Sequence, residues 1–198
     1  MASAHDSPLR KTWKRLKKNK PAIVSLFVII IAVLLAILGP SIAPDKTPDA
    51  DDQVLELANV NPGFTTQMLL VRKNRDERSP SFLSKVFFGQ DNPYQLIPIN
   101  SYKMDGQGNM VVQAFKGEGR TPQEMTFSLA DVVYALSAEE PEVQLIGQQL
   151  SFATFSGDKK TADIAALQKQ ITAENLVIKK YRLGTDGYGR DILSRLLF

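Results

Sequence analysis

The feature that most constrains this sequence is an uncharged stretch near its start. Between Lys20 and Asp45 the chain reads PAIVSLFVIIIAVLLAILGPSIAP. About 20 residues of α-helix, at roughly 1.5 Å per residue, cross a hydrocarbon core about 30 Å thick. From Ala22 to Leu38 the stretch is apolar on every side apart from one serine, which leaves no solvated face for a soluble amphipathic helix. It therefore predicts a transmembrane helix over 21–43.

The ends of this stretch carry helix-boundary signals. Pro21 suits a first helical turn, and Gly39-Pro40 suits a helix end. A cleaved signal peptide is the alternative, because Ser41-Ile42-Ala43 resembles a signal-peptidase site. The apolar run is longer than the usual core of a signal peptide, and Pro44 would follow the cut directly. These two features favour a retained anchor.

Charge is distributed unevenly about the apolar stretch. Residues 1–44 hold seven basic residues and one acidic residue, a balance of +6, whereas 45–198 hold 17 basic and 20 acidic residues, a balance of −3. The basic flank before the helix predicts a cytoplasmic N-terminus, with everything after residue 44 outside the cell. Because the positive charge is concentrated beside one apolar segment, the high pI does not indicate a nucleic-acid binder.

The middle of the chain has the pattern of a mixed α+β domain. Residues 66–73 and 175–183 have strand-like patterns, and two alternating stretches flank Asp105-Gly106-Gln107-Gly108, which is typical of a hairpin turn. Residues 127–137 predict a short helix. The stretch 143–157 is strand-like, and 160–175 predicts a second helix. Strands and helices do not alternate regularly, so α+β is favoured over a doubly wound sheet.

A capping signal and an apolar stripe give finer expectations for these two helices. Ser128 is expected to cap the first helix, and Asp131, three residues on, comes close to a capping box. Ile164, Leu167 and Ile171 form one apolar stripe on the second helix.

The sequence predicts five regions. They are a basic cytoplasmic tail (1–20), a transmembrane helix (21–43), an extended linker (44–62), an extracytoplasmic α+β domain (63–182) and a glycine- and aspartate-rich motif that starts a short amphipathic C-terminal helix (183–198).

Catalytic chemistry has little support in this sequence. The chain has no cysteine and one histidine, His5, which lies in the polar N-terminal tail, so neither thiolate metal sites nor a Ser-His-Asp triad is expected. Phosphate-loop, zinc-protease and nucleophile-elbow motifs are also missing from the sequence. We predict no catalytic, cofactor-binding or metal-binding residues and no enzyme activity.

The C-terminal stretch LGTDGYGRDILSRLLF has dense turn chemistry. Gly184 is expected to end an element in the left-handed conformation, and Asp186 is expected to cap the following helix. Gly187 and Gly189 would permit a tight approach. Arg190 has two possible partners, an ion pair with Asp191 or a neighbouring segment.

This stretch resembles the G-T-D-x-x-G-R-D-x-x-S-R motif of permease subunits in binding-protein-dependent ABC importers of the dipeptide, oligopeptide and nickel class. The matching positions are Gly184, Thr185, Asp186, Gly189, Arg190, Asp191, Ser194 and Arg195. The N-terminal stretch RLKKNKPAIVSLFVIIIAVLLAILGPSIAP is similar to the first segment of the second permease subunit of these importers.

The resemblance implies a transport protein of the bacterial cytoplasmic (inner) membrane. It implies a second permease subunit, cytoplasmic ATPase subunits, an extracytoplasmic solute-binding protein and membrane lipid as partners, and peptides or related small solutes as cargo. In the family, the two motifs lie much closer together, which suggests that 63–182 is an inserted domain. Further membrane helices follow the second motif in the family, so this chain is expected to be an N-terminal portion of such a subunit.

Two other functions remain open from the residues. One is a single-pass, membrane-anchored extracytoplasmic module that binds a partner or acts as a scaffold. The other, a secreted enzyme released by signal cleavage, has no catalytic constellation in its favour.

Overall fold

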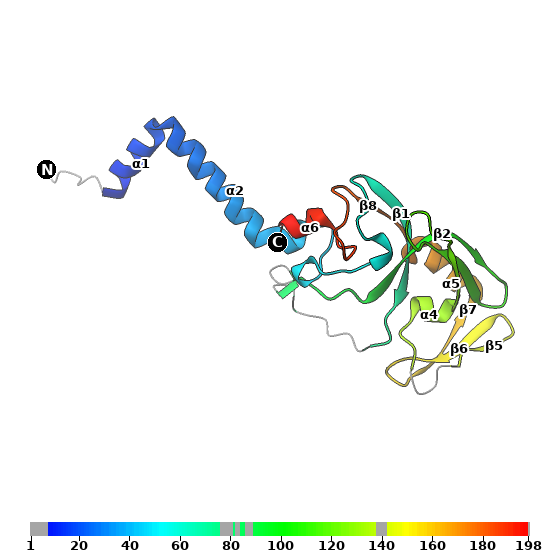
Figure 1. Cartoon of the computed structure of the whole chain (residues 1–198). Helices are drawn as coiled ribbons and strands as arrows, with labels where there is room; N and C mark the ends of the chain where they lie inside the picture. The colour runs from blue at the N-terminus through cyan, green and yellow to red at the C-terminus, as the bar shows by residue number, and fades with distance from the viewer. Residues whose placement is uncertain (1–7, 76–80, 82–83, 86–88, 138–141, 198) are drawn as a thin grey trace.

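The computed structural model describes residues 8–75, 81, 84–85, 89–137 and 142–197. A long helix, α2 (Lys20–Ile42), extends away from a mixed domain of helices and sheets, and helix α6 (Ile192–Leu197) lies beside the C-terminal end of α2 (Figure 1). His5 falls outside the described residues.

Helix α2 is the predicted apolar helix. It is preceded by the basic helix α1 (Pro8–Lys18), and Asn19 between them accepts a bond from the Ala22 amide, capping α2. By length and composition, Lys20–Gly39 is able to cross a membrane, and only 6 % of its most apolar window is buried. That low burial is unlike the core helix of a soluble protein. The helix ends at Ile42, one residue short of the predicted bound at residue 43, and Gly39-Pro40 lies within its last turn.

A five-stranded antiparallel sheet forms the centre of the domain, with strand order β4-β3-β2-β1-β8. The strands are β1 (Phe64–Arg72), β2 (Tyr94–Met104), β3 (Asn109–Ala114), β4 (Gln123–Ser128) and β8 (Leu176–Tyr181). The predicted hairpin at Asp105 is confirmed. The Asp105 carboxylate accepts bonds from the amides of Gln107 and Asn109, which closes the turn between β2 and β3.

Helices and a second sheet cover one face of the central sheet. They are α4 (Leu129–Val133), α5 (Ile164–Gln170), the π-helical turn η3 (Ile171–Asn175), and strands β5 (Gln144–Ile146), β6 (Gln149–Ala153) and β7 (Lys159–Asp163), ordered β5-β6-β7. The main core lies here, with the predicted stripe of Ile164, Leu167 and Ile171 buried in it. The mixed helix and sheet class is confirmed.

Three local expectations differ from the structure. The strand-like stretch 143–157 is a hairpin of β5 and β6, with Gly147 at positive φ in its turn. The predicted helix 160–175 begins only at residue 164, because the residues before it pair with β6 as β7. Ser128 does cap α4, accepting from the Ala130 amide, but α4 ends earlier than expected.

The segment 44–62, which we name the exit segment, differs most from expectation. Instead of an extended linker it carries two short 3₁₀ helices, η1 (Pro48–Ala50) and η2 (Leu55–Leu57). Its apolar residues Val54, Leu57 and Val60 form a second core with Met68 of β1 and Tyr181 of β8. Alternate β1 side chains therefore enter different cores, since Leu69 and Val71 belong to the main one.

Candidate functional site

The C-terminal motif, residues 184–195, folds directly onto the exit segment. The two stretches are joined by backbone and side-chain hydrogen bonds across more than a hundred residues of sequence. We name this joined structure the clasp, consisting of residues 45–62 and 184–195. It lies between the C-terminal end of α2 and the central sheet (Figure 1).

Thr185 holds the middle of the clasp. Its buried hydroxyl donates to the carbonyl of Leu57 and accepts from the amide of Val60 at 3.0 Å. Its own amide donates to the Val60 carbonyl at 3.2 Å. One threonine thus satisfies three backbone groups of the exit segment, groups that would otherwise be buried without partners.

Two glycines of the motif allow the backbones to meet. Gly184 and Gly189 have φ of +78° and +75°, in the left-handed region that favours glycine. A Cβ on Gly189 would lie 1.8 Å from the Val54 carbonyl oxygen, and one on Gly184 would lie 2.3 Å from the Val60 carbonyl oxygen. The expected tight approach at Gly189 is present, whereas a Cβ on Gly187 would meet its nearest atom only at 4.0 Å.

Asp186 and Arg190 close a turn inside the motif. One carboxylate oxygen of Asp186 accepts from the amides of Tyr188 and Arg190, and the other accepts from the Arg190 guanidinium at 2.8 Å. Arg190 also bonds Asp51 at 3.1 Å. Arg190 therefore pairs with Asp186 and with the exit segment, and not with Asp191.

These contacts shift the pKa of both carboxylates. Partial burial raises the pKa of Asp186, but the bonds from Arg190 and Tyr188 outweigh that effect and leave the pKa below its usual range. Bonds from Gln53 and Arg190 lower the pKa of Asp51. Both groups are therefore held in the charged form.

Asp191, not Asp186, caps helix α6. Its carboxylate accepts from both the amide and the hydroxyl of Ser194, and Asp191 and Ser194 are both buried. The Ser194 hydroxyl in turn accepts from the Asp45 amide at 2.9 Å. The expectation for Asp186 failed because its carboxylate is used within the preceding turn.

Helix α6 is fixed against the end of α2 by these bonds. Ser194 joins α6 to Asp45, which follows α2 closely, and the Arg195 guanidinium donates to the Asp49 carbonyl at 3.5 Å. Leu196 is left 71 % exposed. This exposed apolar side chain belongs to α6, the helix that contacts α2.

Tyr181 is the one side chain of the described residues whose buried polar atom lacks a hydrogen-bond partner. Burial raises its pKa, and the nearby carboxylates Asp191, Asp52 and Asp45 raise it further. The phenol therefore stays neutral and contributes to the second core mainly through its ring.

All eight predicted motif residues lie in the clasp, but their partners were missed. Asp45, Asp51, Val54, Leu57 and Val60 belong to the segment that the sequence suggested was a linker. A signal was available, because Val54, Leu57 and Val60 recur at every third position, the repeat of a 3₁₀ helix.

Comparison with known families identifies the N-terminal part of the chain. Residues 7–62 match the family model for the N-terminal TM domain of oligopeptide transport permease C. The match confirms the predicted resemblance for the basic flank and apolar helix, and it includes the exit segment. No curated protein and no solved structure matches the chain.

The family match bears on the function and the cellular location of the chain. The matched family consists of membrane transport permeases and is not an enzyme class, and together with the apolar helix it supports an inner-membrane location. The C-terminal motif lies beyond residue 62, so its resemblance to the family stays a prediction.

Replacing Gly189 with alanine is expected to open the clasp. The new Cβ would be strained at positive φ and would overlap the Val54 carbonyl, so we expect a loss of more than about 2 kcal/mol of local stability. Hydrogen exchange measures this as faster exchange at residues 54–60 and 184–194, with unchanged exchange in β2 and β3. Gly187→Ala is the matched control, and equal protection in both variants would contradict the geometry.

Acid is expected to loosen the clasp. A carboxylate with a lowered pKa in the folded state contributes stability above its unfolded pKa of about 3.9, and that contribution is lost as the pH falls through the lower, folded value. We expect Asp186→Asn to lower the Tm at pH 7 and the difference from the parent chain to shrink below about pH 4. A difference that is constant with pH in thermal melts would show that the Asp186 charge is irrelevant.

Proposed function

We propose that this chain is the N-terminal portion of a permease subunit in a binding-protein-dependent ABC importer for peptides or related small solutes. It works with a second permease subunit, cytoplasmic ATPase subunits and an extracytoplasmic solute-binding protein. The clasp is the observation that carries this proposal.

The clasp joins the two stretches that resemble the family. The exit segment belongs to the part matched by the family model, and the C-terminal motif carries the G-T-D-x-x-G-R-D pattern. Thr185, Gly189 and Ser194 contact the exit segment directly, without residues of the intervening domain between them. Such direct contact is what an ancestral permease with a short connection between the two motifs would need.

The first and last strands of the intervening domain bring its two ends side by side. Phe64 at the start of β1 pairs with Tyr181 at the end of β8, and the Gly63 amide bonds the Tyr181 carbonyl at 2.8 Å. Neighbouring strands lie about 5 Å apart, so a very short link would reconnect the chain if the domain were removed. This arrangement supports an inserted domain.

Charge supports the orientation. The basic residues precede α2, and the exit segment after it is rich in aspartate. Positive-inside bias then assigns α1 to the cytoplasm and the clasp and inserted domain to the outer side. In this orientation the motif's role is to return the chain to the membrane, with α6 held at the outer end of α2 by Asp191 and Ser194.

The inserted domain is proposed to bind the solute-binding protein. The β5–β6 hairpin lies at the end of the domain remote from α2 (Figure 1). Leu145 and Ile146 on β5 are 48 % and 59 % exposed. Exposed apolar side chains at a protruding tip are suited to contact with a partner protein.

Membrane orientation is testable because the chain has no cysteine of its own. With a membrane-impermeant maleimide on spheroplasts, we expect Glu118→Cys to be labelled and Thr12→Cys to be labelled only after lysis. Both positions are exposed, so access to the side chain is not limiting. Labelling of Thr12→Cys in intact spheroplasts would refute the proposed topology. Cleavage that removes the N-terminal segment with position 12 from the mature chain would refute it as well.

Association with the solute-binding protein tests the role of the inserted domain. We expect deletion of residues 64–180, joined by a short glycine link, to reduce capture of that protein on the membrane-embedded chain. Leu145→Ser with Ile146→Ser is expected to reduce capture at least about tenfold, if this apolar pair is an energetic centre of the interface. Ile178→Ser, at a position 78 % exposed on β8, is the control.

Unchanged capture by the deletion variant would exclude the domain as the docking site. It would leave the orientation result untouched.

A further inference from the structure

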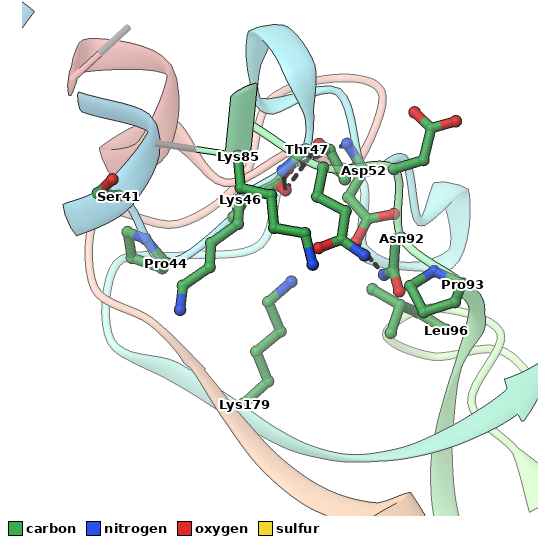
Figure 2. A pocket seen from close by; sticks show the side chains of 13 residues that line it. Ser41, Pro44, Lys46, Thr47, Asp52, Lys85, Asn92, Pro93, Leu96 and Lys179 are labelled. Atoms are coloured by element: carbon green, nitrogen blue, oxygen red, sulfur yellow. Dashed lines mark hydrogen bonds between the residues drawn. The ribbon is translucent and has the colours of Figure 1, made fainter. Parts of the chain in front are cut away.

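A pocket of about 610 Å³ lies where α2 ends and the domain begins (Figure 2). Ser41 and Pro44 form its wall on the side of α2, and Asn92, Pro93 and Leu96 line the opposite side. Its size falls in the range of small-molecule binding sites.

Three lysines from separate parts of the chain converge in this pocket. Lys46 follows α2, Lys85 lies in the short helical turn 84–85, and Lys179 lies on β8. Figure 2 shows the three side chains extending into the same space, with the ends of Lys85 and Lys179 near each other and the end of Lys46 farther toward Pro44. Like charges gathered in this way repel, so the arrangement favours an anion between them.

The carboxylates that line the pocket have other partners. Asp45 accepts from the amide and hydroxyl of Thr47 and from the Asp52 amide. The Asp52 carboxylate accepts from Asn92 at 2.6 Å. Asp91 pairs with Arg75 at 3.6 Å.

Lys179 lies beside Tyr181 and Asp52. Its ammonium lies 5.2 Å from the centre of the Tyr181 ring. Burial raises the pKa of Asp52, and the positive charge of Lys179 offsets a part of that rise. Among the described residues, no ion pair joins a carboxylate to Lys46, Lys85 or Lys179 within 4.0 Å. The three cations are therefore not neutralised by close salt bridges.

We propose that this pocket binds the phosphate of an anionic phospholipid at the membrane surface. The position favours a lipid over a free anion, because Ser41 and Pro44 belong to the end of the apolar helix. Ile37, Leu38 and Ile42 are exposed along the last turns of α2, where the acyl chains of a lipid seated in the pocket would lie. The proposal rests on the proposed function only in that α2 spans a membrane.

Lipid binding by the full chain tests this site. The chain is purified in mild detergent and titrated with phosphatidylglycerol or phosphatidylcholine, with bound lipid counted by native mass spectrometry. We expect tight phosphatidylglycerol binding to weaken about fivefold for Lys46→Gln and for Lys179→Gln, since each lysine near an anionic lipid contributes about that factor. Lys180→Gln is the matched control, because the next residue on a strand points to the opposite face.

The basic residues before α2 will also attract anionic lipid, but they are identical in all of these variants. Equal phosphatidylglycerol binding in the Lys46→Gln, Lys179→Gln double variant and in Lys180→Gln would overturn the proposal. So would displacement of the lipid by millimolar inorganic phosphate, which would indicate a free-anion site. The maleimide experiment separates the two proposals, since a reversed topology would move the lipid to the other leaflet without abolishing its binding.

Discussion

The close approach of two backbones in the clasp is the constraint on which the rest of the structure depends. At Gly189 the chain passes so near the Val54 carbonyl that no side chain fits between them. Thr185 lies next to this approach, and its hydroxyl forms hydrogen bonds with the Leu57 carbonyl and the Val60 amide. These contacts fix the exit segment, and the exit segment connects the membrane helix to the domain.

The clasp also bears on how the proposed inserted domain is accommodated. A long insertion costs little chain entropy when its ends already lie side by side, as Phe64 and Tyr181 do. The domain is nevertheless not loosely tethered, because Met68 and Tyr181 pack with Val54, Leu57 and Val60 in the second core. A displacement of the sheet would therefore act on the clasp through packed side chains.

Features set by local sequence were predictable, and features set by distant partners were not. The Asp105 hairpin and the stripe of Ile164, Leu167 and Ile171 follow from turn chemistry and periodicity over a few residues. The exit segment was interpreted as a linker, since its aspartates and prolines are common in loops and its partners lie more than a hundred residues away. The prediction of Asp186 as the helix cap failed for a related reason, because its carboxylate is used in the three-dimensional turn and Asp191 caps the helix instead.

Asp45 connects the pocket, the clasp and the membrane helix. It follows α2 almost directly, its amide donates to Ser194 at the start of α6, and its carboxylate orders Thr47 and Asp52 in the pocket wall. Because Asp45 is buried and each of these polar groups has a partner, moving one partner leaves another unsatisfied. A phosphate drawn toward Lys46 would therefore act on the same residue that holds α6. The proposed anion site and the position of α6 share one hydrogen-bonded residue, Asp45, so an anion bound in the pocket would be connected physically to the clasp.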